Sequence, residues 1–275
     1  MQLSNFFQLA VAGSIITTGG SLLALFIKDF LFTWYFEDIR DKKALDRVYK
    51  KYKDPIILSS IELSSRIIEI LNTYPTAYLN RDVLNSTPSS LRKNTLDDEH
   101  FKKYKFISTL YRLCSFFGWL ELYRQEITFL SSSNDKVNRD LEKCLLALRS
   151  VFADGHLNSS DDWLQWTDFL IFREEQRGIG ERMIVNNDGT KSVMGYIRFK
   201  ELVQGYIDSN QNDWIGAAID FLTDFKLNKD FRKERLCYLL FHFKNLLKTI
   251  DKKQSRNVIE RMDDCLIRNE RLLPT

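Results

Sequence analysis

The segment at residues 173–182 has the densest group of side chains that could do chemistry. Its sequence, Arg-Glu-Glu-Gln-Arg-Gly-Ile-Gly-Glu-Arg, places acidic and basic groups beside two glycines. Neighbouring carboxylates can support acid–base catalysis, and mixed charges can bind a protein or a small polar ligand. A solvated helix end with paired surface charges is the competing interpretation. We treat six residues as a candidate interaction platform: Arg173, Glu174, Glu175, Arg177, Glu181 and Arg182.

Histidine and cysteine form no recognisable catalytic or metal-binding pattern. The three histidines, His100, His156 and His242, include no pair at i, i+4 spacing, so a zincin-type site is absent. Neighbouring cysteines are at least 28 residues apart, which leaves no CxxC motif. All four lie in apolar helical contexts and are predicted to be buried free thiols: Cys114, Cys144, Cys237 and Cys265. We predict no catalytic residue, metal or cofactor.

Nucleotide and nucleic-acid binding lack sequence support. The chain contains neither GxGxxG nor GxxxxGK[ST], the glycine patterns that cradle phosphates, and no GxSxG nucleophile motif. Its 40 basic and 37 acidic residues give a net charge of only +3, without a global basic field. Without these motifs, the sequence favours a protein that is not an enzyme. The small net charge means that no nucleic acid is expected as a partner.

The elements that would position these residues begin with an apolar segment. Residues 1–27 carry no charged side chain, and Phe6 to Ile27 provides 22 largely apolar residues. At about 1.5 Å per residue, this length covers the roughly 30 Å hydrocarbon core of a bilayer. A signal peptide would show a basic start and a small-residue cleavage site, and a buried helix is the other alternative. We predict an N-terminal transmembrane anchor with an interfacial belt over residues 1–39.

The charges beside this span predict its orientation. Residues 40–54 hold seven basic and three acidic side chains, and basic residues stay on the cytoplasmic side. We therefore expect a single-pass protein of the inner (plasma) membrane with its N-terminus outside and its C-terminal domain in the cytoplasm. The expected partner here is membrane lipid. The predicted membrane-interface residues are Trp34, Tyr35, Arg40, Lys42, Lys43, Arg47, Lys50, Lys51 and Lys53.

Small residues recur inside the predicted span. Gly13, Thr17 and Ser21 follow one another at four-residue spacing, with Gly20 and Ala24 beside them. Such rows let transmembrane backbones approach closely, although small residues are common in spans generally. The row predicts packing against another helix, in a homo-oligomer or with a protein partner.

The fold class predicted for the whole chain is mainly α. Residues 55–275 form a cytoplasmic helical domain whose first helix is expected to start at Pro55. Residues 85–100 are polar and rich in turn formers, which marks a sub-boundary. Residues 101–130 are too polar for a second span and predict a buried core helix. One short β-hairpin is expected around Asp188-Gly189.

Three stretches together resemble the uncharacterised single-pass helical proteins encoded in bacterial phage-defence gene clusters. They are the uncharged N-terminal span, Tyr111-Arg-Leu-Cys-Ser-Phe-Phe-Gly-Trp-Leu-Glu-Leu-Tyr-Arg, and Ile179-Gly-Glu-Arg-Met-Ile before the hairpin. The resemblance covers about a fifth of the chain and carries over no functional residue. It implies a role in an antiviral defence or stress module.

Three functions fit these observations. The first is a membrane-tethered adaptor or regulatory protein that acts through protein–protein contacts. The second is a membrane-disrupting effector that oligomerises through its transmembrane helix. The third is a cytoplasmic enzyme with an unrecognised site around Glu174–Glu181.

Overall fold

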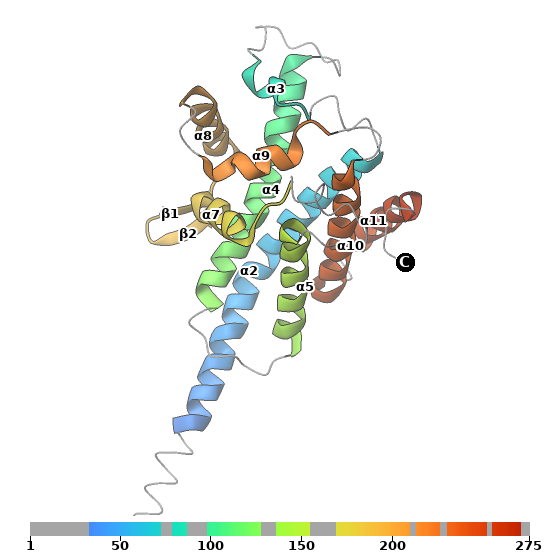
Figure 1. Cartoon of the computed structure of the whole chain (residues 1–275). Coiled ribbons are helices and arrows are strands. Elements are labelled where there is room, and N and C mark those ends of the chain that lie inside the picture. Colours follow the sequence, from blue (N-terminus) through green and yellow to red (C-terminus); the bar gives the residue numbers. More distant parts are fainter. Residues whose placement is uncertain are drawn as a thin grey trace, which may run out of the picture. The chain divides into compact units, whose positions relative to one another are not determined.

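The computed structural model describes residues 33–72, 79–86, 98–127, 136–154, 169–209, 213–225, 230–251 and 255–270. These residues are mainly helical with one two-stranded antiparallel sheet (Figure 1), which confirms the predicted class. The elements are α2 (Thr33–Asn72), α3 (Asp82–Asn85), α4 (Glu99–Ile127), α5 (Lys136–Ala153), α7 (Arg173–Met183), β1 (Ile184–Asn187), β2 (Thr190–Val193), α8 (Tyr196–Ser209), the 3-10 helix η2 (Asp213–Ile215), α9 (Gly216–Leu222), α10 (Phe231–Asp251) and α11 (Arg256–Arg268).

The chain divides into two compact units, and one division falls inside α2 between Arg47 and Val48. The described part of the first unit is residues 33–47, which are helical throughout. Within it, Arg47 Nε donates a hydrogen bond to the Lys43 carbonyl at 3.3 Å. Arg40, Lys43 and Arg47 are exposed, and their place at a membrane interface stays a prediction. The remaining described residues belong to the second unit, and the predicted domain limits stay predictions.

The predicted transmembrane span lies outside the described residues. This applies to residues 6–27 and to the small-residue row within them, and the side chains of Trp34, Tyr35 and Lys42 are not described either. Among the helices in the described ranges, none has a segment long and apolar enough to cross a bilayer. The anchor and its orientation therefore remain predictions from sequence.

The predicted helix start at Pro55 is wrong, because α2 continues through this residue. A proline inside a helix removes one backbone hydrogen bond and costs about 3 kcal/mol. Buried neighbours offset that cost, since Tyr52 and Ile56 are each only 1% exposed. Ser60 Oγ donates to the Ile56 carbonyl at 2.6 Å one turn later. Tertiary packing thus outweighs the local proline signal.

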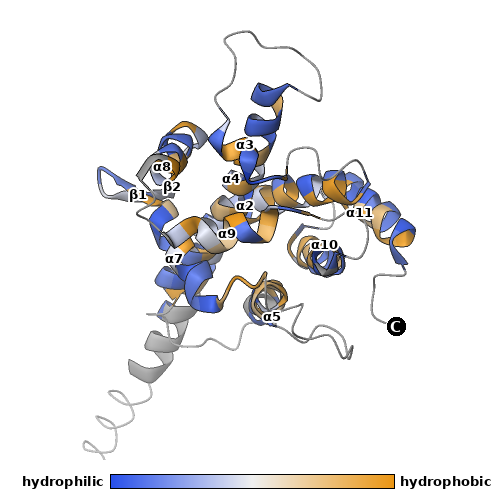
Figure 2. Ribbon diagram, turned by 45° about the horizontal axis from the view of Figure 1, so that its top comes forward, coloured by the Kyte–Doolittle hydropathy of each residue, from blue (hydrophilic) through white to orange (hydrophobic). Residues whose placement is uncertain are grey.

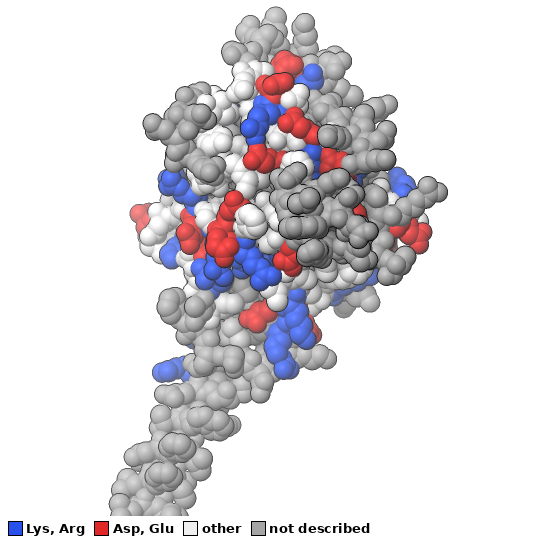
Figure 3. All heavy atoms as spheres, viewed as in Figure 1, with Lys and Arg blue, Asp and Glu red and all other residues white. Residues whose placement is uncertain are grey.

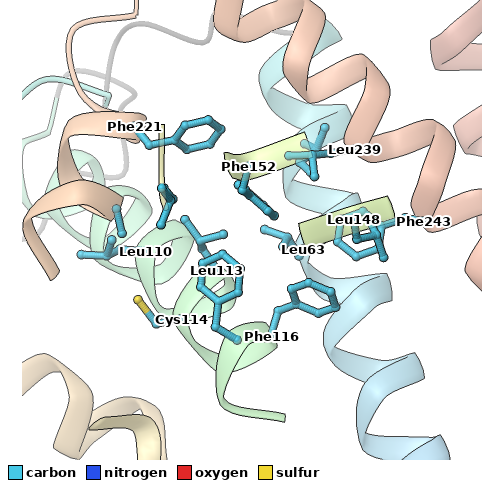
Figure 4. Close-up of a cluster of buried hydrophobic side chains, with 14 of the residues drawn as sticks. Leu63, Leu110, Leu113, Cys114, Phe116, Leu148, Phe152, Phe221, Leu239 and Phe243 are labelled. Atoms are coloured by element: carbon cyan, nitrogen blue, oxygen red, sulfur yellow. The ribbon is translucent and has the colours of Figure 1, made fainter. Parts of the chain in front are cut away.

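Helix α4 carries the core of the second unit, as its aromatic sequence predicts. It is buried almost all round between Phe106 and Tyr123. Phe116 contacts Phe243 of α10 and Phe117 contacts Phe152 of α5, each pair with ring centroids 5.0 Å apart. Figure 4 shows Phe116 and other α4 side chains meeting residues of α2, α5, α9 and α10 in one apolar cluster. α4 is therefore the scaffold on which the outer helices are placed.

The β-hairpin confirms the prediction made from its turn sequence. β1 pairs antiparallel with β2, with Ile184 opposite Val193. Asp188 and Gly189 between them adopt φ of 49° and 81°, the left-handed conformations that a tight two-residue hairpin turn requires. The hairpin closes at its base, where the Met194 N–H donates to the Met183 carbonyl at 2.8 Å. This closure brings the end of α7 and the start of α8 together.

Candidate functional site

Helix α7 begins with a capping interaction, and the residue that caps it is Glu175 of the predicted platform. The Phe172 N–H donates to Glu175 Oε2 at 2.7 Å. Glu174 and Glu175 lie in the first turn, where negative charge is favoured by the helix dipole. Glu175 therefore has a structural role at the helix start. This role follows from its position three residues after Phe172 and does not require a ligand.

Two glycines allow α7 to lie directly against α4. A Cβ atom on Gly180 would be 2.7 Å from the Phe117 carbonyl oxygen and 2.7 Å from Glu121 Cβ. On α4, a Cβ atom on Gly118 would be 2.9 Å from Met183 Cβ. Only glycine fits such contacts between backbones. A Cβ atom on Gly178, in contrast, would meet no other atom within 4 Å, so the two glycines of the charged segment have different roles.

A buried glutamine connects α7 to α5. Gln176 is 2% exposed, and its Nε2 donates to the Ile171 carbonyl at 2.8 Å and to the Arg149 carbonyl at 3.0 Å. Gln176 shares the buried face of α7 with Ile179, Gly180 and Met183, so the charged side chains of the helix lie on the outer surface. Figure 2 shows the ribbon of α7 as largely hydrophilic.

The six predicted platform residues are all exposed, but they do not gather at one place. Arg173 lies at the start of α7, where it donates to Ser150 Oγ at 3.1 Å and pairs with Asp154 at 3.6 Å. Arg177 follows one turn later. Glu181 and Arg182 lie at the opposite end, next to the hairpin. Figure 3 shows acidic and basic side chains interspersed over the visible face of the molecule.

A pocket of about 510 Å³ lies at this second end, and we call it the α7–α8 pocket. It is formed by the end of α7, β1, one face of α8 and η2. Within α8, residues 198, 201, 202 and 205 repeat at the spacing of one helical face. The lining residues are Glu181, Arg182, Ile184, Val185, Met194, Arg198, Glu201, Leu202, Gly205, Tyr206 and Trp214.

The pocket combines apolar surface with charged side chains that form no ion pair with any residue the structure describes. Two arginines, Arg182 and Arg198, and two carboxylates, Glu181 and Glu201, lie along it. In the described part of the chain, none of these four side chains forms a hydrogen bond or ion pair. The half-buried rings of Tyr206 and Trp214 add aromatic surface. This arrangement can bind a group that has both charges and an apolar or aromatic part.

Sequence reasoning identified Glu181 and Arg182 but missed the α8 side of the pocket. The spacing of Arg198, Glu201 and Leu202 was available from the sequence as a helical face. The contribution of Trp214, after an intervening segment, depends on tertiary packing and has no local signal.

The remaining chemistry-bearing residues that the structure describes form no metal site. Among the described residues, no group of three or more His, Cys, Asp or Glu could hold a metal ion. Three cysteines are buried free thiols as predicted, and Cys144 is a half-buried free thiol. Lys51, predicted at the membrane interface, pairs with Glu126 of α4 at 2.5 Å. His156 lies outside the described residues.

Comparisons with known proteins do not place the chain in a family. No protein-family model matches it, and neither the curated proteins nor the solved structures gave a match.

Proposed function

We propose that this protein is a membrane-tethered helical adaptor that binds a protein partner through the α7–α8 pocket and the adjoining face of α8. The α7–α8 pocket is the observation that carries the proposal. Its four charged side chains form no ion pair among the described residues, and they surround apolar and aromatic surface. Protein interfaces combine an apolar centre with a polar rim in this way.

Exposed apolar side chains of α8 extend this surface. Ile197 is 74% exposed and Leu202 is 42% exposed, although both belong to a helix whose other face is fixed by buried Phe199 and Val203. Ile197 precedes Glu201 by one turn, so it adjoins the pocket. A partner segment with an apolar residue between opposite charges would bury this surface and pair its charges.

The tether is the part of the proposal that rests on sequence. The apolar span at residues 6–27 and the basic residues after it support a plasma-membrane location with the helical domain in the cytoplasm. The resemblance to proteins of phage-defence gene clusters makes an antiviral defence or stress module the proposed setting. Resistance of the chain to extraction from membranes by alkaline carbonate tests the anchor, and release by carbonate would contradict it.

Site-specific photocrosslinking tests the partner-binding surface. A photoreactive phenylalanine replaces Leu202 in the full chain, expressed in the cells of origin. The matched control places the same residue at Ile267 of α11, which is 70% exposed and lies outside the pocket. We expect one discrete adduct from position 202, lost when Arg198→Glu is added, and none from position 267. Equal adducts from both positions, or none from 202, would contradict the proposal.

The small-residue row favours a second candidate, an effector that oligomerises through its span and disrupts the membrane. Gly13, Thr17 and Ser21 would allow two such helices to pack closely. This candidate predicts dye leakage on overexpression that is abolished by deleting residues 1–36. Replacing Gly13 and Thr17 with Leu should weaken the oligomer in mild detergent, and an unchanged oligomer would exclude packing through this row.

A further inference from the structure

We propose a second, separate site for a phosphate group, formed by an arginine cluster from α4, α5 and α7. The cluster consists of Arg124, Arg149, Arg173 and Arg177. Its two α7 members lie in the first half of that helix, and the function proposed above uses none of the four arginines, although Glu181 of the α7–α8 pocket acts electrostatically on Arg124.

Backbone and side-chain contacts bring the three helices together at this point. Gln176 Nε2 donates to the Arg149 carbonyl at 3.0 Å, and Arg173 donates to Ser150 Oγ at 3.1 Å. Arg173, Arg177 and Gly180 share one face of α7, because they are separated by four and three residues. Gly180 lies against Glu121 of α4, one turn before Arg124. The cluster is therefore assembled by the packing of α7 against both neighbours.

Two arginines of the cluster are compensated by carboxylates. Glu121, 3% exposed, accepts two hydrogen bonds from Arg124 at 2.6 and 2.7 Å. These bonds, and to a smaller extent the charge of Glu181, raise the pKa of Arg124 against the opposing effect of burial. Arg173 has Asp154 at 3.6 Å. Both guanidinium groups are therefore held in place by the protein itself.

The other two arginines lack such compensation. Within the described residues, neither the Arg149 nor the Arg177 guanidinium forms a hydrogen bond or an ion pair. Their donors are available to an acceptor that enters between α5 and α7.

Both burial and neighbouring positive charges disfavour the charge of Arg149. It is half-buried, and burial is the main cause that lowers its pKa. The positive charge of Arg177 lowers this pKa further, and those of Arg124 and Arg173 lower it to a smaller extent. The negative charge of Glu121 acts in the opposite direction and raises it. A bound anion would remove that repulsion and supply acceptors to the guanidinium groups.

A phosphate monoester fits these donors by charge and geometry. It carries two negative charges near neutral pH, and its oxygens accept paired hydrogen bonds from the planar guanidinium. Arg124 and Arg149 also border an apolar groove of about 130 Å³. The groove's other lining residues are Leu120, Tyr123, Ile127, Glu142, Leu145 and Leu146. In a ligand that joins a phosphate to an apolar group, the phosphate would bind the arginines and the apolar group would fill the groove. A small phosphorylated molecule and an anionic lipid headgroup both have this chemistry.

Calorimetric titration with inorganic phosphate tests the site. The full chain is held in phosphatidylcholine nanodiscs, and chloride keeps the ionic strength constant. We expect saturable binding whose Kd is weakened at least about tenfold by Arg149→Met and by Arg177→Gln, since each removes charged hydrogen bonds. Arg256→Gln on α11 is the matched control, because Arg256 is 80% exposed and pairs with Glu260. Its Kd should equal that of the wild type.

The unfolding midpoint without phosphate distinguishes a binding role from a structural one. Arg149→Met should leave this midpoint unchanged or raise it, because it removes a repelled charge that has no ion-pair partner among the described residues. Absence of binding, equal Kd values in wild type and both variants, or a lowered midpoint with binding retained would overturn the proposal. If Arg149→Met does not fold, Arg177→Gln at its exposed position decides the binding test.

Nanodiscs containing phosphatidic acid identify the source of the phosphate. If the natural ligand is a lipid headgroup, this lipid occupies the site and the heat of phosphate binding is lost. If the ligand is a small phosphorylated molecule, the phosphate Kd stays the same in both lipid compositions.

Discussion

The buried arginines of α10 and the half-buried Arg149 of α5, with its exposed neighbour Arg177, differ in how the fold satisfies their charges. Arg232 of α10 has a 3% exposed side chain and pairs with Asp230 at 2.7 Å. It also donates to backbone carbonyls within residues 220–224, and its guanidinium lies 4.0 and 4.4 Å from the ring centres of Phe169 and Phe225. All three nitrogen atoms of this guanidinium thus donate to oxygen acceptors, and two aromatic rings lie beside the group.

Arg235 repeats the pattern one turn further along α10. It is 1% exposed and donates to the carbonyls of Val151 and Asp154, which ties the end of α5 to α10. Arg149, only two residues before Val151, and Arg177 have no such acceptors among the described residues. The contrast separates arginines that hold the fold together from arginines available to a ligand.

The largest expected effect on stability is at Arg235, whose charge the fold satisfies with hydrogen-bond acceptors. Arg235→Met leaves the buried carbonyl of Val151 and the part-buried carbonyl of Asp154 without this donor and should lower the free energy of unfolding by about 3 kcal/mol. Urea unfolding followed by circular dichroism measures it. If Arg235→Met lowered the free energy of unfolding less than Arg149→Met does, the assignment of Arg235 as structural and Arg149 as ligand-binding would be wrong.

The next effect concerns the two glycines of α7. Gly180→Ala places a methyl group against the Phe117 carbonyl and should destabilise by about 2 kcal/mol, as overpacking between fixed backbones does. Gly178→Ala is the matched control, because its Cβ meets open space and alanine is favoured in helices by up to about 1 kcal/mol. Opposite signs are expected in urea unfolding. Equal effects would show that α7 does not pack this closely on α4.

A smaller effect concerns pH. Burial lowers the pKa of His242 below its ordinary value of 6.5, so the unfolded chain binds the proton more readily than the folded protein. The stability that His242 contributes is therefore present above that value and is lost as the pH falls through 6.5 toward the folded pKa. His242→Gln should flatten the dependence of the unfolding free energy on pH in this window. An unchanged slope would contradict the shift.

The smallest effect on stability is expected in the α7–α8 pocket. Arg198→Glu changes an exposed residue without an ion pair among the described ones, so its unfolding free energy should stay within about 0.5 kcal/mol of the wild type. The same variant should lose the photocrosslink from position 202. A large loss of stability would assign Arg198 a structural role.

Local patterns predicted much of the fold. The Asp188-Gly189 pair predicted the hairpin because both residues must adopt positive φ, and they do. The aromatic sequence of residues 101–130 predicted the buried helix that became α4. The prediction failed at Pro55, where burial of Tyr52 and Ile56 overrides a local helix-start signal.

The site was less predictable, because it depends on contacts between distant residues. The charged segment at 173–182 was identified, but the sequence could not show that α7 separates its charges into two groups. The buried Arg232 and Arg235 also look like solvated charges in sequence. Their acceptors come from other elements, so only the tertiary fold reveals them.

The native mass of the intact protein, purified in mild detergent from the cells of origin, tests the central claim most directly. The adaptor account predicts a complex of the 32.5 kDa chain with a stoichiometric partner, and its loss in Arg198→Glu. A chain that is monomeric, or a homo-oligomer that Arg198→Glu leaves intact, would contradict it.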